Sequence, residues 1–104
     1  MQVLRGDCEV GRVELDDSVH FAHYGVDAGF ERNALEIQFI EVSKQCRRQG
    51  IGTEIIRRLE ADHPSRTLVA FSEEADEFWT SLRWRRYYHP TEPQFYRTLF
   101  IRHV

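Results

Sequence analysis

The chain has 104 residues, a formal net charge of −3 and 41% hydrophobic residues, which indicates one globular domain spanning residues 1–104. It shows neither an apolar run near the roughly 18 residues of a membrane-spanning helix nor the pattern of a signal peptide, and its acidic balance argues against nucleic acid as a partner. Cys8 and Cys46 are too few and too far apart in sequence for a disulfide framework or a zinc site, so we expect a reduced, cytoplasmic protein.

The first part of the chain predicts an antiparallel meander of three strands. Residues 10–15 favour a strand, and the polar residues 16–18 predict a turn. Apolar and polar side chains alternate over residues 19–24, which predicts a second strand. Residues 25–33 hold two glycines and predict a loop, and the third strand is expected at residues 35–42.

The third predicted strand contains a break in its pattern. Leu35, Ile37 and Phe39 alternate with polar residues, but Phe39 is followed directly by the apolar Ile40. Such a slip in an otherwise regular alternation is typical of a β-bulge. We therefore expect this strand to part from a neighbouring strand near Ile40.

A basic turn with two glycines follows this strand and opens a helix. Gly50 and Gly52 leave out the Cβ atoms that would keep an anion from the backbone N–H groups of the helix start. Arg47 and Arg48 add positive charge to that of the helix dipole. The turn therefore predicts a site for a phosphate or pyrophosphate group. The buried face of the helix is predicted from the apolar residues Ile51, Ile55, Ile56 and Leu59.

The remaining elements complete a mixed α/β sheet. The helix should end near residues 62–63, because Pro64 cannot continue it. The apolar residues 67–71 predict a strand buried on both faces and parallel to the third strand. Ser72 is a suitable N-cap for a second helix, whose apolar face holds Ala75, Phe78, Trp79 and Leu82. Residues 86–89 and 95–104 predict a closing hairpin.

The segment Arg47-Arg48-Gln49-Gly50-Ile51-Gly52 resembles motif A of the GNAT-type N-acetyltransferases, Arg/Gln-x-x-Gly-x-Gly/Ala. The order of predicted elements is also similar to the GNAT fold from its second strand to its last. The resemblance implies acetyl-CoA as co-substrate, with the pyrophosphate on the N–H groups of the turn and the pantetheine arm on the backbone of the splayed strand. The cofactor-binding residues implied are Ile40, Glu41, Val42, Arg47, Arg48, Gln49, Gly50, Ile51, Gly52, Thr53 and Ser72.

Glu36 is the candidate general base for acetyl transfer, because the acceptor amine must lose a proton. It lies on the strand beside the implied cleft, where several family members place a glutamate, although a glutamate on a solvated sheet face fits the pattern equally well. Glu41 is a second candidate. Trp79 stands where many members have a tyrosine that protonates the departing thiolate, and an indole is not a useful acid near neutral pH. Residues 87–89 are candidate late donors.

The resemblance implies an N-acetyltransferase that transfers an acyl group to a primary amine by direct attack on the thioester. The alternative is a CoA-binding domain without transferase activity, acting as a sensor or assembly subunit. The family's first strand and the two helices after it have no counterpart, so a homodimer in which a second copy supplies a wall of the cleft is one expectation. The acceptor, a small molecule or a protein amine, is open. His20 and His23 share a predicted strand face, but no third metal ligand accompanies them, and no metal is expected.

Overall fold

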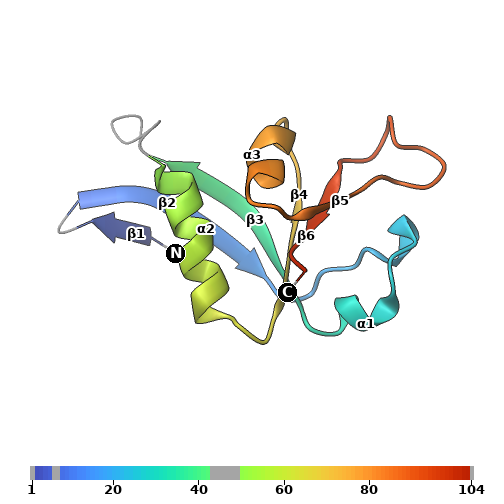
Figure 1. Cartoon of the computed structure of the whole chain (residues 1–104), viewed down its shortest axis with the longest axis horizontal. Helices are drawn as coiled ribbons and strands as arrows, with labels where there is room; N and C mark the ends of the chain where they lie inside the picture. Colours follow the sequence, from blue (N-terminus) through green and yellow to red (C-terminus); the bar gives the residue numbers. More distant parts are fainter. Residues whose placement is uncertain (1, 6–7, 43–49, 104) are drawn as a thin grey trace.

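The computed structural model describes residues 2–5, 8–42 and 50–103. Within these ranges, six strands form one mixed sheet in the order β1-β2-β3-β4-β6-β5 (Figure 1). The β3–β4 pair is parallel, and the other neighbouring pairs are antiparallel. The strands are β1 (Gln2–Arg5), β2 (Cys8–Asp16), β3 (Ala34–Val42), β4 (Thr67–Phe71), β5 (Arg85–Tyr87) and β6 (Leu99–Ile101), and the helical elements are η1 (Ala22–Tyr24), α1 (Ala28–Glu31), α2 (Ile51–Asp62) and α3 (Asp76–Ser81).

The predicted antiparallel meander is present, but one of its strands was misplaced. Residues 19–24 are not a strand: they end in the short 3₁₀ helix η1, and Gly25, at φ 74°, closes that turn by donating its N–H to the Ala22 carbonyl. The alternation of Val19 and Phe21 instead reflects burial of both side chains against the sheet. The missing strand of the meander is β1, at residues 2–5, which pairs with β2.

Two hydrophobic cores lie on opposite faces of the sheet. The first packs α2, α3 and the chain after α3 against one face, and Figure 1 shows α2 lying across β2 and β3. The second lies under residues 19–34, which include η1 and α1. β4 contributes to both cores, with Leu68 and Ala70 in the first and Val69 in the second. This confirms that β4 is buried on both faces.

Helix α2 has the predicted bounds and the predicted buried face. Its apolar residues Ile51, Ile55, Ile56 and Leu59 are all buried in the first core. The helix ends at Asp62, where the N–H of His63 bonds to the Leu59 carbonyl just before Pro64. No helix among the described residues is long and apolar enough to cross a membrane.

The second half of the chain follows the predicted order with shorter elements. Ser72 is not the N-cap of α3, which begins only at Asp76; its Oγ instead accepts a hydrogen bond from the Ala75 N–H at 3.2 Å. Trp79 and Leu82 are buried, and Ala75 and Phe78 pack against the same core. The closing hairpin is confirmed, with strands at 85–87 and 99–101.

Candidate active site

The central feature of the site is the parting of β3 from β4. In the described residues the parallel ladder joins residues 34–36 to 67–69 and ends at the pair Glu36–Val69. β3 continues to Val42, still paired with β2, whereas β4 ends at Phe71. This confirms the predicted splaying of the two strands and leaves the edge of residues 37–42 that faces β4 outside the ladder.

A bulge in β3 accompanies the parting. Glu14 of β2 pairs with Phe39 and the next residue, Leu15, with Ile37, so Gln38 is the extra residue. The bulge therefore lies one residue before the predicted Phe39–Ile40 position. Because of it, Ile37 is buried in the first core and Ile40 also packs against that core, although the two are an odd number of positions apart.

The N-terminus of α2 provides the candidate anion site. The helix's own hydrogen bonds begin with the Glu54 N–H donating to the Gly50 carbonyl at 3.0 Å, so the N–H groups of Ile51, Gly52 and Thr53 precede that ladder. Gly50 has φ 73°, and a Cβ built on it would meet no atom of the described residues within 4 Å. The aligned peptide dipoles give this end of the helix a partial positive charge. The Ile51 side chain points into the core, so only its backbone is available to an anion.

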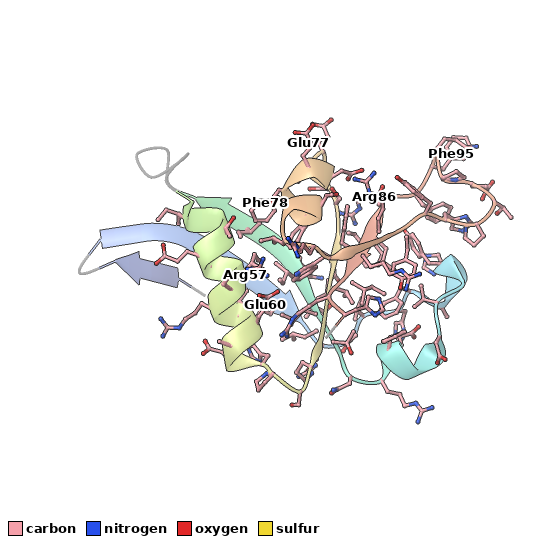
Figure 2. The ribbon with its side chains drawn as sticks, viewed as in Figure 1. Arg57, Glu60, Glu77, Phe78, Arg86 and Phe95 are labelled. Atoms are coloured by element: carbon pink, nitrogen blue, oxygen red, sulfur yellow. The ribbon has the colours of Figure 1, made fainter. Side chains whose placement is uncertain are left out.

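Gly52 has a structural role that the sequence interpretation missed. A Cβ built on it would lie 3.2 Å from the Phe78 ring of α3, which Figure 2 shows on the side of α3 that faces α2. The absence of a side chain at Gly52 therefore allows the two helices to approach. The predicted binding residues Arg47, Arg48 and Gln49 lie outside the described residues, and for Glu41 and Val42 the structure describes the backbone.

Glu36, the candidate base, lies at the last β3–β4 pair and is half-buried. Burial raises the pKa of its carboxyl group, and the nearby carboxylate of Asp16 raises it further, while Arg97 and a hydrogen bond from Gln38 act in the opposite direction. Asp16 and Arg97 were not predicted as site residues. They are distant from Glu36 in sequence, and only the register of β2 against β3 could have indicated Asp16.

An open cleft of about 730 Å³ lies beside α3. Ser72 and Phe78 line it from the chain after β4, and Tyr96, Arg97 and Thr98 line it from the segment before β6. Ser72 is buried, and its backbone N–H bonds to the Thr98 carbonyl at 2.8 Å. Ser72, a predicted cofactor-binding residue, and Arg97 therefore line the same cleft. The charge of Arg97 also lowers the pKa of Glu36.

Trp79 and the candidate proton donors at residues 87–89 all contact other side chains or backbone groups. Trp79 is 4% exposed, and its ring centroid lies 4.8 Å from that of Trp84. The Tyr87 hydroxyl is hydrogen-bonded to the His103 Nε2 at 2.7 Å, and the Tyr88 hydroxyl accepts a hydrogen bond from Arg86. His89 Nδ1 accepts from the N–H groups of Thr91 and Glu92.

The two histidines that were considered as a metal pair contact different groups. The Nδ1 of His20 lies 3.0 Å from a Glu31 oxygen. His23 stands in a tilted arrangement with the rings of Tyr24, His89 and Tyr96. Among the residues that the structure describes, no group of three or more His, Cys, Asp or Glu side chains could hold a metal ion.

Comparison with known proteins gives one match. The family model described as the acetyltransferase (GNAT) family matches residues 10–82. The matched segment runs from β2 to the end of α3 and includes the β3–β4 parting and the N-terminus of α2. Comparisons with curated proteins and with solved structures found no match. Because the family model covers more than half of the chain and the sheet has the expected topology, the chain belongs to the GNAT family of acetyltransferases.

Proposed function

We propose that this protein binds acetyl-CoA and transfers the acetyl group to a primary amine by direct attack of the amine on the thioester. The observation that carries the proposal is the end of the β3–β4 ladder at Glu36–Val69, on the strand that leads toward the N-terminus of α2. A half-buried carboxylate and a strand edge outside the ladder thereby lie along one strand, β3, whose far end leads toward a helix N-terminus. Family membership gives the class of reaction. In this proposal the three features provide a base, a strand edge for the pantetheine arm and a site for the pyrophosphate.

The backbone provides the binding groups in this proposal. The N–H groups of residues 51–53 would hold the pyrophosphate, because a helix N-terminus favours negative charge and a glycine at position 50 has no Cβ that would restrict an anion. The edge of β3 at residues 40–42, which lies outside the β3–β4 ladder, would bond the amides of the pantetheine arm as an added strand would. A donor on this edge would also polarise the carbonyl that is attacked. Acetyl-CoA itself supplies the activated acetyl group as a thioester.

Glu36 takes the role of general base in this proposal. An amine that is protonated in solution must lose a proton before it can attack, and a carboxylate whose pKa is raised by burial accepts that proton more readily near neutral pH. Because Glu36 belongs to the last β3–β4 pair, it lies where the two strands begin to separate. The positive charge of Arg97, from the segment before β6, also acts on this carboxyl group and lowers its pKa.

One observation favours the second candidate function, a CoA-binding domain without transferase activity. Trp79 is buried against Trp84 and Phe78, so the position that carries an acid in many family members here holds a core side chain. An assay of thiol release from acetyl-CoA over a panel of amines separates the two functions. Release that depends on both amine and Glu36 supports the transferase, whereas saturable acetyl-CoA binding without release with any amine selects the binding domain.

A further inference from the structure

Asp16 and Glu36 form a pair of carboxylates that face each other across two strands. They are Cα partners in the antiparallel β2–β3 ladder, and directly opposed residues of such a ladder carry their side chains on the same face. Like charges in this arrangement destabilise a sheet. The pair therefore has an energetic cost that neighbouring positions of the sheet do not share.

Hydrogen bonds fix the Asp16 carboxylate in place. Its Oδ1 accepts from the Ser18 N–H at 2.9 Å, and its Oδ2 accepts from the Gln38 Nε2 at 3.2 Å. Gln38 is the bulge residue of β3 and lies two residues after Glu36 on the same strand. The bulge residue of the strand that carries Glu36 thus holds the Asp16 carboxylate.

The charged groups around Glu36 come from two elements. β2 presents Asp16, and the segment before β6 presents Arg97, whereas the neighbour on β4 is the uncharged Val69. Burial and Asp16 raise the pKa of Glu36, and Arg97 lowers it. Arg97 is half exposed and already pairs with Glu73 at 3.2 Å, so its effect on Glu36 is shared with that partner, whereas the Asp16 carboxyl group accepts hydrogen bonds from neutral groups.

We propose that Asp16 is a positioning residue for acetyl transfer, which faces Glu36 across the β2–β3 ladder and strengthens it as a proton acceptor. The inference rests on the proposed function, in which Glu36 receives the proton of the acceptor amine. Asp16 contacts neither acetyl group nor amine in this role. It acts on the reaction through the basicity of Glu36.

The test compares Asp16→Asn with Asp17→Asn, a matched change at the adjacent exposed residue. Asn at position 16 keeps an oxygen that accepts from Ser18, so the turn is retained. The Glu36 carboxyl is titrated by carbon-13 NMR, with its signal assigned through Glu36→Gln, and the pH profile of acetyl transfer is recorded with the best amine. Asp16→Asn should lower the Glu36 pKa and move the acidic limb of the rate profile to lower pH, with a loss of turnover smaller than the about 10²-fold minimum expected for removing a general base. Asp17→Asn should change neither.

The two measurements separate the inference from the proposed function. An identical Glu36 titration in the two variants overturns the inference, whatever the protein catalyses. A shifted titration with an unmoved rate profile also overturns it, because Asp16 would then act on Glu36 without acting on the reaction. Wild-type protein that transfers acetyl to no amine contradicts the proposed function and, with it, the positioning role, while the titration still reports the coupling of the two carboxylates. A merely structural role would lower the melting temperature and leave both profiles in place.

Discussion

The indole Nε1 of Trp84 donates a hydrogen bond to Oε2 of Glu60 across 3.0 Å, in a buried contact that joins the chain after α3 to helix α2. The same carboxylate accepts two bonds from Arg57, shown beside it in Figure 2, and lies 3.5 Å from the Nε of Arg102. Glu60 is 9% exposed. It therefore joins α2 to the residue before β5 and to the residue after β6.

Replacement of Glu60 by Leu should destabilise the protein by about 3 kcal/mol, because it leaves the Trp84 N–H and the Arg102 guanidinium without their buried partner. Urea denaturation measures this loss. Arg58→Ala is the control: it removes an exposed ion pair with Asp62 and should change stability by less than about 0.5 kcal/mol. Equal losses of stability in the two variants would contradict a larger contribution from the buried contacts of Glu60.

Gly52→Ala should show energetic coupling to Phe78. Ala is favoured over Gly in a helix by about 1 kcal/mol, but the new Cβ would lie 3.2 Å from the Phe78 ring. In the wild-type background this contact should remove most of the gain, whereas in a Phe78→Leu background the gain should return. A double-mutant cycle by urea denaturation measures the coupling, and additive effects would contradict the contact.

Gly50→Ala and Gly25→Ala should each cost about 1–2 kcal/mol, because both glycines have positive φ and an L-residue is disfavoured there. Among the described residues neither new Cβ meets a close obstacle, since the nearest atom to that of Gly25 is a Pro90 carbon at 3.7 Å. Asn at either position should cost less than Ala. Urea denaturation of the four variants tests this, and a negligible cost at Gly50 would argue against its left-handed conformation.

Glu36→Gln should lower turnover by about 10²–10⁴-fold if Glu36 is the base, and it should also stabilise the fold at neutral pH. The folded-state pKa of Glu36 is raised from 4.5. The stability that this group contributes is thus present below pH 4.5 and is lost as the pH rises through the folded-state pKa. The melting temperature of Glu36→Gln should therefore match that of wild type in acid and exceed it at pH 7. A variant that loses stability relative to wild type as the pH rises would contradict the raised pKa.

The sequence was most informative where periodicity and covalent geometry act locally. The apolar spacing of α2, its end before Pro64, and the parity slip in β3 predicted elements that the structure confirms. The alternation at residues 19–24 was misleading, because an irregular segment that packs on a sheet can bury Val19 and Phe21 as a strand does. Burial alone, without ladder hydrogen bonds, produced the pattern.

Only the backbone features of the candidate site could be predicted from the sequence. The glycine turn and the splayed strand are local signals, whereas the environment of Glu36 depends on the register of β2 and on Arg97, which follows it by more than half of the chain. Gly52 was interpreted as room for an anion, and its contact with Phe78 depends on how α3 packs against α2. Such tertiary contacts leave no periodic signal in the sequence.

Calorimetric titration with acetyl-CoA tests the central claim, that the N-terminus of α2 and the splayed β3 hold this co-substrate, most directly. We expect wild type to bind one acetyl-CoA per chain saturably. Gly50→Ala should weaken that binding, whereas Gly25→Ala, which introduces the same change at a glycine of nearly the same φ away from α2, should leave the dissociation constant unchanged. Folded wild-type protein that shows no binding at millimolar acetyl-CoA, or equal affinities in the two variants, would contradict the claim.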